Sequence, residues 1–463
     1  MFTSFLKCDI FILVMIMSKV VIGQKTYQTI ENFGVSGAWW AQDVGGWEGV
    51  RDEIAELLFS SEKGIGIKCY RFNLGGGSKN SGSSDFFNKN RMAECFLKND
   101  GTYDFSRDKN AVYMLKAAVD NGCDSVVLFV NSPPEIYTKN HKSCLDKPLH
   151  TNLAKKNYKN FTAYCVKCAE HFIGEGIPVT SISPVNEPVW IWTYKNGQEG
   201  CHYRPWGVRE VMRALADEMD KSKILKENNV MISGAENGDI RWFNKTYSRI
   251  MLGDKKIRAF SDGVDVHSYF LNDHILPKFN NRLKFAARWR KYIDRKFPSS
   301  KVRVSEWTHM RGGRDSSMDS ALVQARVMYE DLTVLNAVSW QHWIAVSDVD
   351  YCDGLIYINP DRTYEITKRY YAFGNFSKFI KNGAVRVNIY GGTDSLKLIA
   401  FKQKSETVVI AINLSEKESE LKFEKSGKAY ITDKDSSLEG KDFNGKFSVT
   451  PKSVTTFVLS EEG

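Results

Sequence analysis

Ser181-Ile182-Ser183-Pro184-Val185-Asn186-Glu187-Pro188 is a short stretch in which small and apolar residues lead to an amide, a carboxylate and a proline. A second stretch, Val302-Arg303-Val304-Ser305-Glu306-Trp307, alternates apolar and polar residues and also reaches a glutamate. Short runs of this kind, bounded by turn residues, predict β-strands. We therefore expect two strands that each carry a glutamate at the carboxyl end.

Short apolar runs of this type alternate with longer amphipathic segments over residues 32–381, which predicts repeated βα units and a parallel sheet. The expected strands are Asn32–Trp39, Ile67–Gly75, Ser125–Pro134, Thr180–Pro188, Asn229–Glu236, Gly263–Phe270, Lys301–Thr308 and Ala337–Ala345. The expected helices are Val50–Phe59, Asn110–Asn121, Ala154–Ile173, Val208–Leu225, Arg282–Phe297 and Ser317–Leu335. Eight such units close into a (β/α)8 TIM barrel, so the fold class is α/β.

The pattern changes after Asn382, where period-two strands are separated by turn residues. Strands are expected at Ser395–Lys402, Thr407–Leu414, Ser419–Phe423, Ala429–Asp433 and Ser453–Leu459. This tail, residues 382–463, reads as a small C-terminal antiparallel β-sandwich side domain. Residues 24–31 precede the first barrel strand and are expected to add an edge strand to it.

Residues 1–23 combine an early lysine, an apolar run and a small residue before Gln24, which is the pattern of a cleaved signal peptide. No second apolar run of about 20 residues follows, so no integral membrane segment is expected. We therefore expect a secreted, extracellular protein. The eight cysteines beyond the signal peptide then favour disulfide bonds, with pairings left open. Sequons at Asn160, Asn244, Asn375 and Asn413 predict a glycoprotein.

The composition fits a globular protein with many rings, since 42% of the 463 residues are hydrophobic and 13% are aromatic. The net charge of +9 is dispersed and forms no basic stripe, so no nucleic-acid partner is expected. Cys165 and Cys168 form a CxxC pair, but no second pair or nearby His pair accompanies it, so no metal is expected. No dinucleotide or phosphate-binding loop occurs, so no cofactor is expected, and the simplest expectation is a monomer.

The two strand-end glutamates carry the predicted chemistry, because barrel enzymes place reacting groups at the carboxyl ends of strands. Two carboxyl groups about 5 to 5.5 Å apart break a glycosidic bond by covalent displacement, one attacking the anomeric carbon while the other protonates the leaving oxygen. A single strand-end glutamate is as readily a surface carboxylate. The pair, with Asn186 before Glu187 and Pro188 after it, favours a glycosidase, because the amide can bind a sugar hydroxyl and the proline fixes the backbone.

The chain resembles glycoside hydrolase family 30, which belongs to the clan A retaining barrel glycosidases. The resemblance rests on Gly37-Ala38-Trp39-Trp40-Ala41-Gln42, Tyr70-Arg71-Phe72-Asn73-Leu74-Gly75-Gly76-Gly77, Asn131-Ser132-Pro133-Pro134, Ser183-Pro184-Val185-Asn186-Glu187-Pro188, Val266-His267-Ser268-Tyr269, Ser305-Glu306-Trp307 and Ser339-Trp340-Gln341-His342-Trp343. It implies that Glu187 is the acid/base and Glu306 the nucleophile of a retaining O-glycosyl hydrolase. It also implies the barrel and the side β-sandwich that the patterns predict.

The resemblance extends to the residues around the two glutamates. It implies that Arg71 lies beside Glu306 and keeps it ionised, although an ordinary ion pair is the alternative. It implies that Tyr269 hydrogen-bonds Glu306 and that His267 faces the sugar, although a histidine within a strand is as often a core residue. Among the aromatic residues it implies that Trp340 lies under the cleaved sugar, whereas Trp39, Trp40 and Trp343 line the cleft or pack the barrel top.

The substrate is expected to be a β-linked polysaccharide. Trp39-Trp40, the glycines at 75–77 and the loop Gln198–Tyr203 are most similar to the endo-β-1,6-galactanase branch of the family. β-1,6-Glucanase, xylanase and glucosylceramidase are the alternatives within the family. The alternative from another class is a non-catalytic carbohydrate-binding protein on the same barrel, which the presence of both glutamates disfavours.

Overall fold

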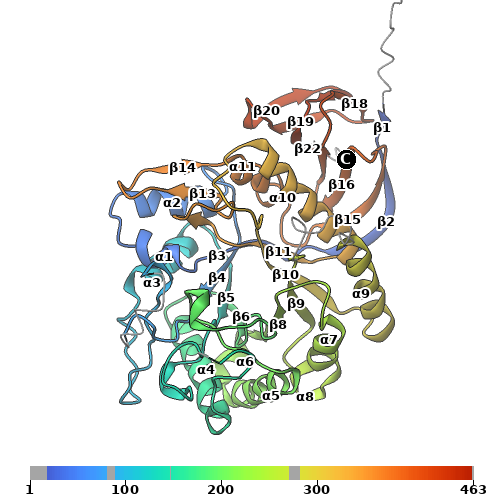
Figure 1. Cartoon of the computed structure of the whole chain (residues 1–463). Helices are drawn as coiled ribbons and strands as arrows, with labels where there is room; N and C mark the ends of the chain where they lie inside the picture. The colour runs from blue at the N-terminus through green and yellow to red at the C-terminus, as the bar shows by residue number, and fades with distance from the viewer. Residues whose placement is uncertain (1–17, 81–88, 146, 271–281, 461–463) are drawn as a thin grey trace, which may run out of the picture.

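The eight expected barrel strands are all present and pair in parallel around one ring (Figure 1). The computed structural model describes residues 18–80, 89–145, 147–270 and 282–460. The barrel strands are β3 (Asn32–Ser36), β4 (Cys69–Asn73), β5 (Ser125–Phe129), β6 (Val179–Ser183), β7 (Met231–Ile232) with β8 (Ala235–Asn237), β9 (Gly263–His267), β10 (Lys301–Trp307) and β11 (Ser339–His342). The fifth strand is split, and its two parts pair with β6 and β9, which closes the ring.

Helices cover the outside of the barrel (Figure 1). They are α1 (Trp40–Val44), α2 (Val50–Phe59), α3 (Lys109–Asp120), α4 (Tyr158–Gly174), α5 (Pro205–Lys221), α6 (Lys223–Glu227), α7 (Asn244–Gly253), α8 (Lys255–Arg258), α9 (Arg282–Lys296), α10 (Met318–Glu330) and α11 (Lys368–Ser377). In α5 the buried side chains recur at Val208, Val211, Met212, Leu215 and Met219, the spacing of one helical face, and Pro205 stands in its first turn. These buried stripes fix the barrel strands from outside.

The side domain forms where the tail was expected, and it holds more strands than the sequence pattern indicated. Its larger sheet has the order β2 (Val21–Thr29), β15 (Val385–Tyr390), β16 (Leu396–Gln403), β17 (Glu406–Asn413), β22 (Ser453–Ser460), β19 (Gly427–Thr432) and β20 (Ser437–Phe443). The smaller sheet contains β1 (Ser18–Lys19), β18 (Ser419–Lys422) and β21 (Lys446–Val449). A separate small sheet, β12 (Val346–Ser347), β13 (Ile356–Ile358) and β14 (Tyr364–Ile366), follows the last barrel strand.

The side domain packs against α10 and α11 rather than standing free (Figure 1). Asn375 in α11 donates its side-chain amide to the Tyr430 carbonyl and to Thr456 Oγ1, at 3.0 and 2.9 Å. Thr456 donates back to the Asn375 carbonyl at 2.7 Å. These buried hydrogen bonds join the domain to the barrel, because each would leave a desolvated polar group if the two separated.

Residues 18–23, assigned from the sequence to the signal peptide, belong to the side domain in the structure. Ser18 and Lys19 pair with Leu421 and Lys422, and Val20 is buried in the domain core. The apolar residues before Gly23 therefore suit strand positions as well, and the signal-peptide boundary at Gly23 stays a prediction. Residues 1–17 lie outside the described residues. Within the described part of the chain, no helix is long and apolar enough to cross a membrane.

The predicted disulfides are absent from the described residues, where eight cysteines lie buried and none is joined to another. They pack as small apolar side chains; the sulfur of Cys95, for example, lies 3.6 Å from the Tyr164 hydroxyl. Burial raises the pKa of the Cys95 thiol to about 12. The Cys95 thiol is therefore protonated at neutral pH in the folded protein.

Three of the four predicted glycosylation sites are closed by the fold. Asn244, Asn375 and Asn413 are buried, and each uses its side-chain amide as a hydrogen-bond donor. A glycan attached to such a nitrogen would displace these buried contacts. Asn160 is exposed on α4 and keeps the prediction open.

We predict that removal of Ser18–Gly23 destabilises the protein. A chain beginning at Gln24 loses the pairing of β1, the first part of β2 and the buried Val20, whose burial alone is worth about 2 kcal/mol. Thermal denaturation should show a lower midpoint for this chain than for one beginning at Ser18. Equal midpoints would show that these residues contribute nothing to the fold.

Candidate active site

A cleft of about 320 Å³ opens at the carboxyl-terminal end of the barrel strands, and both predicted catalytic glutamates line it. Glu187 follows β6, and Glu306 lies in β10. The other lining residues share polar or aromatic character: Arg91, Asn131, Asn186, Trp190, Trp192, Asn196, Gln198, Tyr269, Thr308, Trp343, Tyr351 and Asp353, together with Gly238 and Met310. Many hydrogen-bonding groups beside flat rings make a surface suited to sugars.

Glu306 is held by two donors and is almost closed off from solvent. Arg71 Nη1 donates to its Oε2 at 2.9 Å, and the Tyr269 hydroxyl donates to its Oε1 at 3.0 Å. Both neighbours were expected from the sequence to be here. Burial raises the pKa of the Glu306 carboxyl, while the charges of His267 and Arg71 act in the opposite direction. The net direction is upward, so Arg71 alone does not set the charge of Glu306 as anticipated.

Glu187 stands on a turn that points its carboxyl into the cleft. Its φ of 42° lies in the left-handed region, which is rare for a residue other than glycine and is found at sites that position a side chain. The turn is fixed by hydrogen bonds from Trp190 N and Trp192 Nε1 to the Glu187 carbonyl, at 3.0 and 3.1 Å. Gly238 leaves room for the carboxyl, because a Cβ there would stand 2.7 Å from Glu187 Oε1.

The two glutamates approach each other across the mouth of the barrel. One carboxylate oxygen of Glu187, one of Glu306 and a ring nitrogen of His267 all lie within 4.8 Å of one another. Carboxyl groups about 5 to 5.5 Å apart suit covalent displacement, whereas separations of about 6.5 to 9.5 Å leave space for a water molecule between carboxylate and sugar. The short separation favours direct attack by one of the two carboxylates.

Arg71 and Asn186 form a buried, hydrogen-bonded support beneath Glu187 and Glu306. Arg71 is fully buried, and its Nη2 donates to Asn186 Oδ1 at 2.9 Å. Asn186 in turn donates to Asn131 Oδ1 at 3.0 Å, and the Arg71 guanidinium lies 3.7 Å from the centre of the Phe129 ring. With its position fixed on several sides, Arg71 holds a positive charge beside Glu306.

His267 bridges the acidic groups of the site. Its Nδ1 lies 2.9 Å from Glu187 Oε1, and its Nε2 lies 3.1 Å from Glu236 Oε2. Burial alone would lower the pKa of His267, but the charge of Glu306 and the hydrogen bonds with Glu187 and Glu236 raise that pKa to about 10. His267 is therefore an imidazolium at neutral pH. It is fully buried and is not among the described residues that line the cleft, so its contact with the sugar stays a prediction.

By residue type, Glu187, His267 and Glu306 could also hold a metal ion. A histidine ligand must be neutral, with a free nitrogen lone pair for the metal. Here both ring nitrogens of His267 face carboxylate oxygens, and its pKa is about 10. The arrangement therefore fits a hydrogen-bonded acid/base site better than a metal centre.

Glu236, which was not predicted, completes the group. It is fully buried in β8, and its Oε2 accepts hydrogen bonds from both Arg71 Nη2 and His267 Nε2. Burial alone would raise its pKa, but the charge of Arg71 and the hydrogen bond from His267 lower the pKa of Glu236 to about 2. The signal was available, since the fifth expected strand also ends in this glutamate.

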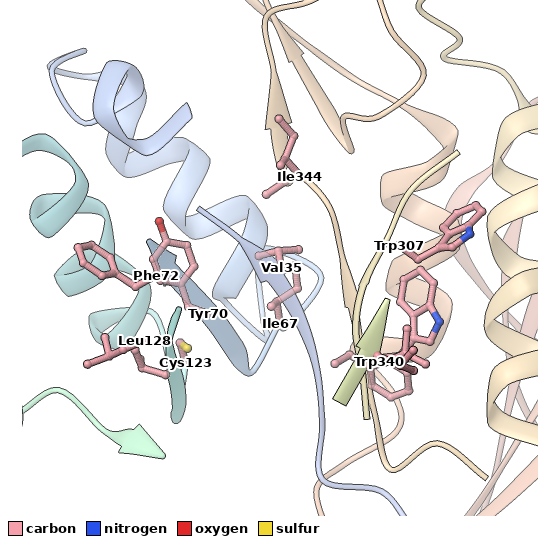
Figure 2. Packing of buried hydrophobic residues seen from close by; sticks show 14 of the residues in the cluster. Val35, Ile67, Tyr70, Phe72, Cys123, Leu128, Trp307, Trp340 and Ile344 are labelled. Carbon is pink, nitrogen blue, oxygen red and sulfur yellow. The ribbon is translucent and has the colours of Figure 1, made fainter. Parts of the chain in front are cut away.

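Trp340 does not lie under the sugar, contrary to the prediction. It is completely buried, and its Nε1 donates to Asp331 Oδ2 at 2.9 Å. Its ring packs against Trp307, with ring centres 5.8 Å apart (Figure 2). It also packs against Phe373 in the hydrophobic core, with ring centres 5.9 Å apart. The reason is strand alternation: Trp340 points outward to the helices, and residues on the opposite face point into the barrel.

Trp343, just beyond β11, is the tryptophan of this segment that lines the cleft. Trp39 packs edge-on against it, with ring centres 5.3 Å apart, and supports it from behind. Trp40 donates its Nε1 to the Ser36 carbonyl at 2.9 Å and belongs to the core. Neither Trp39 nor Trp40 is among the described residues that line the cleft. Trp190 and Trp192, missed from the sequence, supply further cleft rings.

A parallel barrel with paired carboxylates at the carboxyl ends of its strands is the arrangement of a glycoside hydrolase. The chain belongs to O-glycosyl hydrolase family 30, whose sequence profile matches residues 17–357. It is 25% identical over 413 residues to an endo-β-1,6-galactanase of Hypocrea rufa, covering 82% of this chain and 78% of that protein.

Solved structures share the fold of this chain. A conserved exported protein from Bacteroides fragilis superimposes with a TM-score of 0.85 at 25% identity, over 95% of this chain and all (100%) of the other. A family 30 xylanase C catalytic domain from Talaromyces cellulolyticus gives 0.73 at 17% identity, over 96% and 100%. An endo-β-1,6-glucanase gives 0.71 at 17% identity, over 96% and 94%. The last two likenesses concern the fold.

We predict that His267 stays protonated far above the ordinary histidine pKa of 6.5. Its charge then stabilises the folded protein fully below pH 6.5, and this contribution is lost as the pH rises through about 10. Nuclear magnetic resonance of ¹⁵N-histidine-labelled protein should show one imidazolium persisting at pH 8, and that signal should vanish in His267→Gln. Titration of this ring near 6.5 would contradict the assigned network.

Proposed function

We propose that the protein is a secreted retaining endo-β-1,6-galactanase, which hydrolyses a β-linked polysaccharide by double displacement. The observation that carries the proposal is the short approach of Glu187 and Glu306, with oxygens within 4.8 Å, at the carboxyl end of the barrel. The nearby donors Arg71 and Tyr269 act on Glu306 and leave Glu187 with a different environment. Two carboxyls in unlike surroundings suit an acid and a nucleophile.

In the first step, an oxygen of Glu306 attacks the anomeric carbon while Glu187 gives its proton to the leaving glycosidic oxygen. The carbon–oxygen bond to the leaving sugar breaks, and a covalent glycosyl–enzyme forms on Glu306. Arg71 and Tyr269 orient the attacking carboxylate through their hydrogen bonds to its two oxygens. Asn186, which lines the cleft beside Glu187, supplies an amide for a sugar hydroxyl.

In the second step, Glu187, now a carboxylate, takes a proton from water. The resulting hydroxide attacks the anomeric carbon and breaks its bond to Glu306, which leaves as a carboxylate. Two inversions return the sugar to its original anomeric configuration. Both steps use only the protein's own side chains and water.

The choice of galactan rests on relatedness to the Hypocrea rufa enzyme, and the choice of endo action rests on the aromatic lining of the cleft. Trp190 and Trp192 follow Glu187 on its own turn, and Trp343 and Tyr351 also line the cleft. Several rings in one cleft provide stacking surfaces for more than one sugar of a chain. Secretion is supported by the likeness to an exported protein, and Asn160 is the exposed sequon that a glycan could occupy.

We predict that the protein releases oligosaccharides from β-1,6-galactan faster than from β-1,6-glucan, xylan or glucosylceramide, and that the first product is the β-anomer. In Glu306→Gln, the neutral amide cannot form the glycosyl–enzyme, so activity should fall below about one hundredth of wild type. Reducing-sugar release gives the rates, and proton magnetic resonance of fresh products gives the configuration.

The matched control is Glu365→Gln, since Glu365 is an exposed glutamate of β14, away from the cleft. It should leave galactan hydrolysis unchanged. Release of the α-anomer first would contradict double displacement. Full activity of Glu306→Gln would remove Glu306 from its assigned role, and hydrolysis of another polysaccharide in place of galactan would correct the substrate alone.

A further inference from the structure

We propose that Glu236 is a positioning residue that keeps His267 doubly protonated, so that the acid proton of Glu187 faces the leaving group. This proposal rests on the proposed function of Glu187 as the acid. Glu236 does not line the cleft among the described residues, and it touches the reaction through its neighbours alone.

The geometry makes one oxygen of Glu236 the shared acceptor of two cations. Oε2 accepts from Arg71 Nη2 and, at 3.1 Å, from His267 Nε2. Arg71 has only donors, so the atom facing it must be an acceptor. His267 Nε2 faces that same acceptor and therefore carries a hydrogen.

The second nitrogen of His267 decides where the proton of Glu187 lies. Nδ1 is 2.9 Å from Glu187 Oε1. When His267 is doubly protonated, Nδ1 donates to Oε1, so the acid proton of Glu187 occupies the other oxygen, Oε2. If His267 were neutral with its hydrogen on Nε2, Nδ1 would be an acceptor and would bind the acid proton. That proton would then point away from the glycosidic oxygen.

Charge balance explains why a carboxylate is needed at this position. The groups around His267 are Arg71 from β4, Glu187 after β6, Glu236 from β8 and Glu306 from β10, with Tyr269 and the buried Asp265 on its own segment. With Glu187 protonated and ready to react, two cations face two anions, Glu236 and Glu306. Without Glu236, one carboxylate would face both cations in a buried site, and the weaker cation, His267, would lose its proton.

The backbone supports a dedicated position for this residue. Glu236 has a φ of 48°, in the left-handed region, and its carbonyl accepts a hydrogen bond from Glu187 N at 2.9 Å. Both ends of the residue therefore act on Glu187, the carbonyl directly and the carboxylate through His267. A residue that served only to fill the core would need neither contact.

The experiment is Glu236→Gln, which keeps the shape and an acceptor for Arg71 but removes the negative charge. The pKa of His267, followed by ¹⁵N-histidine resonance, should fall by at least about two units, because the variant loses a buried opposite charge. Hydrolysis of galactan should fall at least about a hundredfold, the usual worth of a general acid. Hydrolysis of a dinitrophenyl β-1,6-galactobioside, whose leaving group needs no proton, should fall less than about tenfold.

Glu199→Gln is the matched control, because Glu199 is also a fully buried glutamate but accepts its hydrogen bonds from Gly76 N, Ser78 N and Ser78 Oγ. It should leave the pKa of His267 as in wild type. The ratio of the hydrolysis rates of galactan and the dinitrophenyl substrate should also be unchanged. Glu236→Asp, which restores the charge, should return part of the lost galactan hydrolysis.

The proposal is overturned if folded Glu236→Gln keeps the wild-type titration of His267. It is overturned as well if the hydrolysis rates of galactan and of the dinitrophenyl substrate fall by the same factor. It is also overturned, whether or not the variant folds, if His267 of the wild-type protein titrates near the ordinary histidine pKa of 6.5. The resonance measurement needs no substrate. Failure to hydrolyse galactan would therefore count against the proposed function and would leave this readout intact.

Discussion

The site depends on the burial of balanced charges at the carboxyl end of the barrel. Arg71 and Glu236 are removed from solvent completely, and Glu306 nearly so. An unpaired charge in such a place costs several kcal/mol, so each of these groups is tolerated only because the others are present. The same mutual dependence fixes their directions, which is what a reaction between a carboxylate and an anomeric carbon requires. The same balance of buried charges is therefore required for both stability and catalysis.

Most of the fold could be predicted from the sequence, because a barrel strand is buried on both faces and reads as a short apolar run between amphipathic helices. The placement of Glu187 and Glu306 followed from the same logic, since the ends of parallel strands meet at one mouth. Glu236 ends the expected strand Asn229–Glu236 by that same pattern and was nevertheless missed, because its role depends on contacts with Arg71 and His267, which lie on strands far away in the chain.

Other features could not be read from the sequence, for physical reasons that differ. Alternation along β11 does not say which face points inward: Gln341 lines a polar cavity at the opposite end of the barrel, whereas Trp340 faces the helices. Residues 18–22 are apolar enough for a signal peptide and equally suited to a strand. An Asn-X-Ser/Thr motif carries no information on burial, and Asn413 is an internal donor to two turns of the side domain. Each of these depends on contacts between segments far apart in the chain.

The central claim is that Glu306 forms a covalent bond to the sugar while Glu187 serves as the acid. It is tested most directly by incubating the protein with 2-deoxy-2-fluoro-β-1,6-galactobiosyl fluoride, which forms the glycosyl–enzyme quickly and releases it slowly. Mass spectrometry of the digested protein should find the fluorinated sugar on Glu306 alone. A label on Glu187 or on any other residue would contradict the account, as would rapid hydrolysis of the reagent without any labelled intermediate.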